Sequence, residues 1–263
     1  MKIVVTVKQV PDTNAEKTFD PATKRLNRTS IENVLNPFDE YAIEEALRIK
    51  EAIGGDTTVT ILTMAPASGT DVVRKALGMG ADNAVLLSDD AIGGSDTMAT
   101  AYALAQAIKS NGFDLVLSGT QSTDAISSVV PAAIAEHLGV PCVTYVKKLT
   151  VTDGALEAQR ETESGYLKVK APLPALVSVT KAINEPRYPT LKGIMGAKKK
   201  EIKTPSLADI GADPAKLGDA GSKTQVEMFT PVGARQKGTV VNATDPKEGA
   251  KQILDFLIAK KVV

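Results

Sequence analysis

The sequence has little of what several classes of protein need. Its 263 residues contain one cysteine, Cys142, one histidine, His137, and no tryptophan. A single cysteine excludes an intrachain disulfide, and with a single histidine it also excludes metal sites built from several such ligands. Lysine plus arginine balance aspartate plus glutamate at 31 each, so no net charge favours nucleic acid or an anionic membrane as a partner.

The first residues do not form a secretion signal or a membrane anchor. Residues 2–8 are a strand-like run that is far too short to cross a bilayer. We therefore expect a cytoplasmic protein in a reducing compartment, with neither membrane nor nucleic acid as its partner. The apolar fraction of 43% supports a large core, and small aliphatic side chains must fill it because only 4% of the residues are aromatic.

Apolar runs and helical patterns alternate through the first 140 residues. Strands are predicted at residues 3–7, 59–64, 84–87 and 115–117, and helices at 37–53, 70–77, 96–110 and from about 127 to 138. This alternation is typical of a doubly wound, mostly parallel α/β sheet. Gly78-Met79-Gly80 follows a helix, so we interpret it as a helix end and not as a dinucleotide fingerprint.

The pattern changes after Pro141. Residues 143–151 and 156–161 flank the hairpin turn signal Asp153-Gly154, and strands at 166–170 and 175–182 follow. We expect these strands to form an antiparallel addition, either on the sheet edge or as a separate small sheet. Residues 201–245 are rich in glycine and proline and lack periodicity, and a last helix is predicted at about 246–260.

Two domains are therefore predicted. Residues 1–200 form the α/β domain, and residues 201–263 form an extended C-terminal arm that ends in a helix. Such an arm has no core of its own, so we expect it to pack on a partner subunit.

The stretch from Asp114 to Pro131 is the strongest candidate for a binding site. A buried strand breaks at Ser118-Gly119 into hydroxyl and amide side chains, and a helix follows. In an open parallel sheet, ligands bind at the carboxyl ends of the strands, where a helix start offers free N–H groups to an anion. We expect neutral donors here to bind phosphate, with Asp124 orienting the backbone or a sugar hydroxyl. An ordinary polar loop with a helix cap explains the loop equally well.

Residues 184–200 suggest a docking surface. Two prolines and two glycines frame the apolar residues Leu191, Ile194 and Met195, and three lysines follow. Apolar side chains on an exposed loop are typical of partner recognition. The alternative, that they fold back onto the core, remains open from the residues alone.

Other polar or reactive side chains carry weaker predictions. Lys24, Arg25 and Arg28 are interpreted as part of a solvated loop, with contact to phosphate or a partner as the alternative. His137 is predicted to be a surface or packing residue, and Cys142 a small buried residue.

Taken together, these segments resemble the β subunit of an electron transfer flavoprotein nearly from end to end. The most specific match is Asn184-Glu185-Pro186-Arg187-Tyr188, with Leu191, Ile194-Met195 and Ala197 to Lys200. The segments Val7 to Val10, Asn36-Pro37-Phe38, Ala76 to Asp82 and Leu115 to Gln121 also fit. Within the family, Lys8 to Thr13 is similar to the electron-bifurcating type of anaerobic bacteria. One departure is Ser127 to Pro131, where ordinary members have a more polar segment that contains asparagine.

The resemblance implies a larger α subunit that holds a redox-active FAD. In the ordinary type the β subunit keeps AMP, whereas in the bifurcating type it holds a second FAD that NADH reduces. Further implied partners are a ferredoxin or flavodoxin, and an acyl-CoA dehydrogenase with a pocket for Leu191, beside Ile194 and Met195. An adenine-nucleotide-binding module on a similar scaffold is the alternative from another class of protein.

The resemblance also implies which residues contact the cofactor, and neither a catalytic residue nor a metal ligand is expected among them. The implied contacts are Thr6, Asn36, Pro37, Phe38, Asp39, Met64, Gly119, Thr120, Gln121, Ser122, Thr123, Asp124, Ala125, Ile126, Ser127 and Ser128.

Overall fold

The computed structural model describes residues 1–152, 154–230, 233, 238 and 240–263. Asp153 of the predicted hairpin turn, and residues 231–232, 234–237 and 239 of the predicted arm, lie outside this described part. The chain divides into a compact unit, Met1–Glu227, and a terminal unit, Met228–Val263. Among the described residues, no helix is both long enough and apolar enough to span a membrane.

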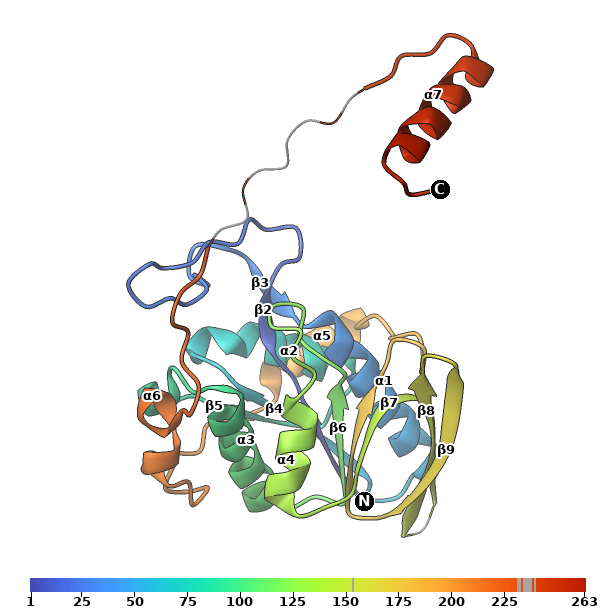
Figure 1. Ribbon diagram of the computed structural model, residues 1–263. Helices are drawn as coiled ribbons and strands as arrows, with labels where there is room; N and C mark the ends of the chain where they lie inside the picture. Colours follow the sequence, from blue (N-terminus) through green and yellow to red (C-terminus); the bar gives the residue numbers. More distant parts are fainter. Residues whose placement is uncertain (153, 231–232, 234–237, 239) are drawn as a thin grey trace. The chain divides into compact units, whose positions relative to one another are not determined.

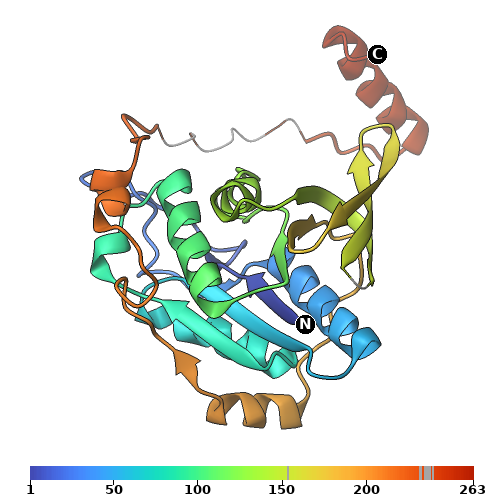
Figure 2. The same ribbon diagram turned by 90° about the horizontal axis from the view of Figure 1, so that it is seen from below.

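The compact unit is built on a nine-stranded sheet with helices on both faces (Figures 1 and 2). The strands of this sheet are β1 (Lys2–Thr6), β4 (Thr58–Met64), β5 (Asn83–Leu87), β6 (Leu115–Gly119), β7 (Cys142–Thr152), β8 (Ala155–Thr162), β9 (Gly165–Pro172), β10 (Ala175–Val179) and β11 (Ile202–Lys203). The helices are α1 (Pro37–Ile53), α2 (Thr70–Met79), α3 (Thr97–Asn111), α4 (Val130–Leu138), α5 (Leu191–Lys199) and α6 (Gly218–Gly221). A small antiparallel pair, β2 (Gln9–Pro11) and β3 (Asn33–Leu35), lies outside the main sheet.

The strand order is β11-β5-β4-β1-β6-β10-β7-β8-β9. All pairs from β11 to β7 are parallel, and β8 and β9 add antiparallel strands at one edge. The chain runs from β1 through β4 to β5 on one side and then returns to β6 on the other side of β1. The predicted doubly wound, mostly parallel fold with an antiparallel addition is therefore confirmed, and the strand order reverses between β1 and β6.

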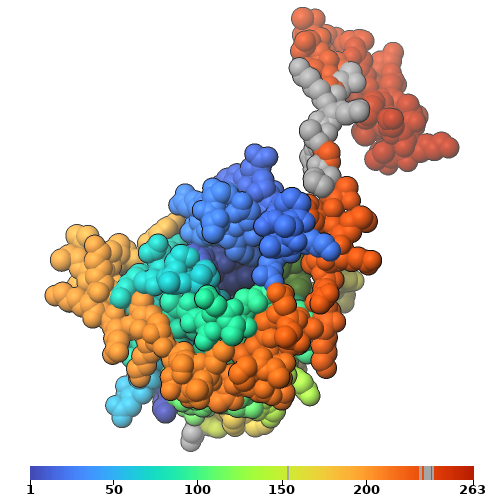
Figure 3. Space-filling view, turned by 90° about the vertical axis from the view of Figure 1, so that its left-hand side faces the viewer, coloured from blue at the N-terminus to red at the C-terminus, as the bar shows by residue number. Residues whose placement is uncertain are grey.

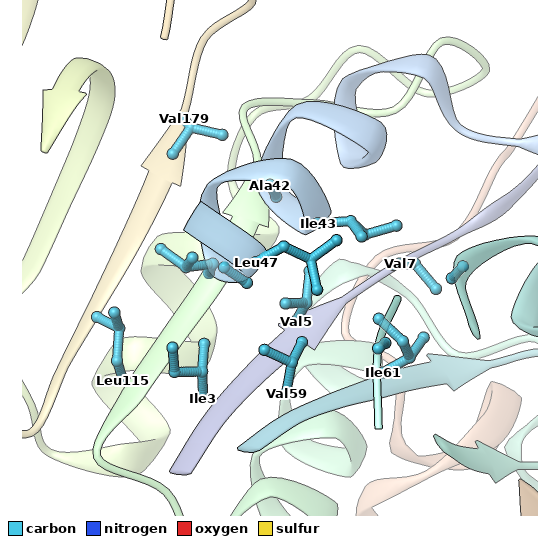
Figure 4. Close-up of a cluster of buried hydrophobic side chains, with 14 of the residues drawn as sticks. Ile3, Val5, Val7, Ala42, Ile43, Leu47, Val59, Ile61, Leu115 and Val179 are labelled. Atoms are coloured by element: carbon cyan, nitrogen blue, oxygen red, sulfur yellow. The ribbon is translucent and has the colours of Figure 1, made fainter. Parts of the chain in front are cut away.

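Alternation along the central strands divides the core between the two faces. Ile3 and Val5 of β1 point toward α1, together with Val59 of β4 and Leu115 of β6 (Figure 4). The intervening Val4 belongs to the cluster under α3 and α4. Successive side chains of a strand point to opposite faces, so strands covered by helices on both sides are apolar at nearly every position.

The position of β10 differs from the prediction. We expected residues 175–182 in the antiparallel addition, but β10 lies between β6 and β7 and is parallel to both. Its five residues, Ala-Leu-Val-Ser-Val, are all buried, which is typical of a central parallel strand. Cys142 is exposed at the start of β7, where we expected a buried residue, and it is the neighbouring Val143 that packs into the core.

The compact unit extends beyond the boundary predicted at residue 200. Strand β11 pairs with β5, and Leu207, Ile210 and Leu217 are buried in the α3 side of the core. The amide of Asp213 donates to the hydroxyl of Tyr102 on α3 over 2.9 Å. Residues 201–227 lack helical or strand periodicity, yet a few spaced apolar side chains attach them to the body.

The terminal unit contains one helix, α7 (Pro246–Ala259). Asp245 caps its start by accepting a hydrogen bond from the amide of Lys247. None of its residues is buried, and Ile253, Leu254 and Phe256 are each more than half exposed. A helix of this length obtains most of its stability from packing an apolar face, so α7 needs another surface.

We predict that the full-length chain, purified alone, associates in solution, because exposed apolar helical faces favour association. Sedimentation velocity should show species larger than the monomer. A version that ends at Glu227 is the control, and we expect it to sediment as a monomer. A compact monomeric full-length chain, with α7 protected from protease, would contradict this prediction.

Candidate functional site

A cleft of about 610 Å³ opens at the carboxyl ends of the central strands. Its walls include the residues that follow β1, β4, β5 and β6, so it lies where the strand order reverses. Figure 3 shows the surface hollowed between the blue residues near the N-terminus and the green residues that follow β5. Ligands of open parallel sheets bind in this position.

The structure brings most of the predicted cofactor contacts together around this cleft. Those that line it are Thr6, Asn36, Asp39, Met64, Gly119, Thr120, Gln121, Ser122, Ala125, Ser127 and Ser128. Those that do not line it are Pro37, Phe38, Thr123, Asp124 and Ile126. The contact of any of these residues with a ligand stays a prediction.

Gly119 allows the loop after β6 to pass close to the start of α1. A Cβ atom at this position would lie 2.5 Å from Oδ1 of Asp39 and 2.8 Å from the carbonyl carbon of Phe38. The contact that requires glycine is therefore with the protein's own helix. Phe38 contributes to the site through this packing rather than by lining the cleft.

Asn36 joins the start of α1 to the loop. It stands at the N-cap position, but its side chain makes no capping hydrogen bond. Instead its Nδ2 donates to the carbonyl of Gln121 over 2.9 Å, and its Oδ1 accepts from the amide of Thr123 over 3.2 Å. The structure therefore fixes the loop against α1 through one buried amide side chain.

The end of the loop is held in an uncommon backbone conformation. Ile126 and Ser128 have φ values of 52° and 54°, in the left-handed region that few residues other than glycine adopt. Ser128 donates through its hydroxyl to Oε1 of Gln121 over 3.1 Å. Helix α4 consequently begins at Val130 and not at the predicted residue 127. Non-glycine residues in this region concentrate at ligand-binding sites.

Asp124 lies behind the cleft between two cations. Its side chain is 1% exposed, and Oδ1 accepts a hydrogen bond from Nζ of Lys8 over 2.8 Å while Oδ2 accepts from Nη2 of Arg28. Burial acts against the charged form, but Lys8 and Arg28 outweigh it and lower the pKa of Asp124 to about 2. Arg28 is therefore part of the cleft wall and not of a freely solvated loop.

Asp39 is a second acidic residue of the site, and it is buried. Its carboxylate accepts hydrogen bonds from the amide of Lys8 over 2.7 Å and from Nδ2 of Asn36 over 2.9 Å. These bonds favour the ionised form, but burial is the larger effect and raises the pKa of Asp39 to about 7. The residue therefore changes its charge near neutral pH.

The wall that follows β5 was missed by the sequence reasoning. It is formed by Ser88, Asp89, Asp90 and residues 93–97. Asp96 caps α3, and its other oxygen accepts from the hydroxyl of Thr224 over 2.9 Å. The rule that ligands bind at strand carboxyl ends would have found this wall if it had been applied to β5 as well as to β6.

The predicted docking segment contains a helix where we expected a loop. Thr190 caps α5 by accepting from the amide of Gly193, which explains why the helix begins at Leu191. Leu191, Ile194 and Met195 are 76%, 45% and 62% exposed. The alternative that these residues fold back onto the core is therefore wrong.

Arg187 holds the beginning of the docking segment on α1. Its guanidinium donates to both oxygens of Glu44, over 2.7 and 3.1 Å, and to both oxygens of Glu51, over 2.6 and 3.1 Å. Burial disfavours the charged form of Glu44, but hydrogen bonds from Arg187 and Arg48 hold the pKa of Glu44 below its ordinary value. Asn184 adds a bond to Glu45 over 3.0 Å.

Helix α2 holds the other end of the segment. Nη1 of Arg74 donates to the carbonyls of Ala197, over 2.5 Å, and Lys200. A Cβ atom at Gly193 would lie 2.4 Å from the carbonyl oxygen of Gly78, so only glycine permits this approach of α5 to α2. Both ends are thus attached to the body while the apolar residues between them face outward.

We predict that Asp39 makes the stability of the protein depend on pH. Its pKa is raised from 3.8 to about 7 on folding, so the folded state binds the extra proton and stability falls as the pH rises between these values. Between pH 5 and pH 8 the loss of stability should be on the order of 3 kcal/mol. Denaturant unfolding at pH 5 and pH 8 should show it. Asp39→Asn should reduce the difference, whereas Asp71→Asn, an exposed control, should leave it unchanged.

An equal pH dependence in wild type and Asp39→Asn would show that Asp39 does not cause the effect. Asp124 does not interfere with this measurement. Its pKa is lowered, so the stability that its ionised form contributes is lost only at strongly acid pH.

Comparison with known proteins gives one consistent result. Residues 23–210 match the electron transfer flavoprotein domain. The chain is 44% identical to the electron transfer flavoprotein subunit beta of Mycobacterium tuberculosis, over 99% of both chains, and 43% identical to that of Megasphaera elsdenii, over the whole of both. It is also 40% identical, again over the whole of both chains, to the caffeyl-CoA reductase-Etf complex subunit CarD of Acetobacterium woodii. The chain therefore belongs to the electron transfer flavoprotein family as a β subunit, a type of protein that serves electron transfer and pairs with an α subunit.

Proposed function

We propose that this β subunit binds FAD in the cleft and takes electrons from NADH in an electron-bifurcating flavoprotein. The observation that carries the proposal is the cleft where the strand order reverses. It combines groups that can donate hydrogen bonds to phosphate, cationic side chains and apolar walls. Its volume of about 610 Å³ lies within the range of roughly 300–1,000 Å³ that ligand pockets occupy.

The residues of the cleft fit the chemical groups of FAD. The hydroxyls of Ser122 and Ser127 can donate to phosphate oxygens, and Lys8 and Arg28 supply positive charge. Apolar side chains suit the flat rings of an adenine or a flavin, and those in the wall include Met64, Ile92, Leu104 and Val130.

The role of this chain is to hold the cofactor and to control its surroundings. FAD, when bound, supplies transfer of both one and two electrons. Asn36 and Gly119 keep the binding loop against α1. The buried carboxylates of Asp39 and Asp124 contribute to the charge around it, Asp124 in its ionised form. Apolar walls reduce the access of water to a bound ring.

Electrons would leave through two groups of partners. One route leads to a ferredoxin or flavodoxin, and the other leads through the FAD of the α subunit to an acyl-CoA dehydrogenase. The likeness to a subunit named for a caffeyl-CoA reductase-Etf complex supports an acyl-CoA-linked partner. The exposed apolar residues of α5 would dock on the dehydrogenase, and α7 would pack on the α subunit.

A second candidate is the ordinary carrier, in which the cleft holds structural AMP. It is favoured by the hydroxyl- and amide-rich loop from Thr120 to Ser128, which offers enough donors for one phosphate without any cation. A nucleotide-binding module that carries no electrons is the remaining alternative, although it gives no role to the exposed face of α5.

Cofactor stoichiometry tests the proposal. We predict two FAD per heterodimer when the chain is produced together with its α subunit. The protein should be denatured, and the released flavin measured by its absorption and the released nucleotides by chromatography. One FAD with one AMP would instead establish the ordinary carrier. A heterodimer that contains neither a second flavin nor AMP would contradict both.

Leu191→Ala should weaken electron delivery to the acyl-CoA dehydrogenase. Burial of one leucine in a partner pocket is worth about 1.5–3 kcal/mol, which corresponds to roughly ten- to a hundredfold in affinity. Flavin content and melting temperature should not change, because the side chain is 76% exposed and does not line the cleft. Affinity, flavin content and melting temperature should be measured on one preparation.

Ile53→Ala is the control for the docking prediction. It removes an apolar side chain that is 45% exposed at the end of α1, outside the docking segment, and should leave the affinity unchanged. If Leu191→Ala binds the dehydrogenase as tightly as wild type, α5 does not provide the docking contact.

A further inference from the structure

We propose that residues 12–32, which we call the strap, form a lid on the cleft, and that the ion pair between Arg25 and Asp219 is the latch that keeps this lid closed. Opening of the latch lets a nucleotide enter and leave. The inference rests on the proposed function, because it requires a nucleotide in the cleft.

The strap is an excursion between β2 and β3 whose two ends lie close together. At its base the amide of Asp12 donates to the carbonyl of Glu32 over 2.9 Å. Its tip, residues 18–27, is a compact turn in which a β-bridge joins Phe19 to Leu26, and further backbone hydrogen bonds close the turn. A compact loop on a narrow base is often functional, and it can move as one body about that base.

Two arginines attach the strap to different walls of the cleft. Arg28 pairs with Asp124 in the loop after β6, and Arg25 pairs with Asp219 in α6 over 2.5 and 2.6 Å. A Cβ atom at Gly94 would collide with the guanidinium of Arg25 and with the carboxylate of Asp219, so this second pair lies on the wall that follows β5. Strands β5 and β6 are three strand spacings apart, or about 14 Å. The strap therefore connects the two walls.

The two attachments differ in how easily they separate. Asp124 is 1% exposed and also pairs with Lys8, so withdrawal of Arg28 would leave a buried carboxylate with fewer partners, at a large cost. The side chains of Arg25 and Asp219 are 50% and 72% exposed, and water readily replaces the partners of an exposed ion pair. The pair at Arg28 is thus the fixed anchor, and the pair at Arg25 is the latch that opens.

The segment that carries Asp219 is itself fixed to the wall. The amide of Gly218 donates to the hydroxyl oxygen of Ser95 over 2.8 Å, and the amide of Asp96 donates to that of Ser222 over 2.7 Å. Both bonds join residues of the cleft wall to residues on either side of the latch carboxylate. When the latch opens, it is therefore the strap that moves.

The latch should change the rates of nucleotide exchange and not the affinity. Neither Arg25 nor Asp219 lines the cleft, so their ion pair can form whether or not a nucleotide is bound. Loss of the pair lowers the barrier to entry and the barrier to release by the same amount, which leaves the dissociation constant unchanged. Loss of a direct contact with the nucleotide would instead change mainly the rate of release.

The test is the exchange of radiolabelled AMP on the nucleotide-free full-length chain. Association is measured by rapid filtration after mixing, and release is measured after addition of excess unlabelled AMP. We expect Arg25→Met to raise both rates about two- to fivefold, the range that one exposed ion pair supplies. Asp219→Asn should have the same effect, and it provides the same measurement if Arg25→Met does not fold.

A double variant and a control make the result specific to the ion pair. Arg25→Met combined with Asp219→Asn should exchange AMP no faster than either single variant, because all three lack the same pair. Lys17→Met is the matched control, since Lys17 is an exposed cation of the strap and forms no ion pair in the part of the chain that the structure describes. It should keep the wild-type rates.

Unchanged exchange rates in the folded latch variants would overturn the lid. Faster release without faster association would also overturn it, because that pattern indicates a lost contact with the nucleotide. In both cases AMP still binds, so the proposed nucleotide function survives. Failure of the wild type to bind AMP would overturn both the lid and the proposed function.

Discussion

The site depends on the close contact between the start of α1 and the end of β6. Gly119 makes this contact possible, because a side chain there would collide with Phe38 and Asp39. Asn36 then joins the helix start to the loop. Asp39 accepts a hydrogen bond from the amide of Lys8, which follows β1. The ends of two neighbouring strands and one helix are thus fixed by a few buried polar groups, and the cleft forms between them.

The same helix also supports the docking segment. Its first turn belongs to the cleft, while Glu44 and Glu51 farther along it hold Arg187. The exposed face of α5 is therefore attached to a rigid element that also forms part of the cleft wall. A surface fixed in this way would lose little conformational freedom if a partner docked on it, which would favour affinity.

Charge is distributed unevenly around the cleft although the whole chain is neutral. Cations gather beside the loop after β6, and carboxylates gather after β5. A bound dinucleotide would therefore experience opposite charge at its two ends. Overall composition could not reveal this arrangement, because it depends on which loops the sheet brings together.

The sequence by itself determined the class of the fold and most of its main helices and strands. Apolar periodicity and capping residues are local signals, so the main-sheet strands β1, β4, β5 and β6 and the start of α1 at Pro37 could be read directly. Of the sixteen residues that the resemblance to a known family selected, eleven line the cleft. The segment from Leu191 to Lys199 was predicted to be a docking surface, with burial in the core as the open alternative, and its helical conformation was not predicted.

Only the tertiary structure decided how distant segments pair. The parallel position of β10, the attachment of residues 201–227 and the pairing of Asp124 with Lys8 and Arg28 join parts of the chain that are far apart in sequence. No local pattern encodes such pairings, because each depends on the burial and charge that the folded sheet creates. For the same reason two aspartates of one site, Asp39 and Asp124, acquire pKa values of about 7 and about 2.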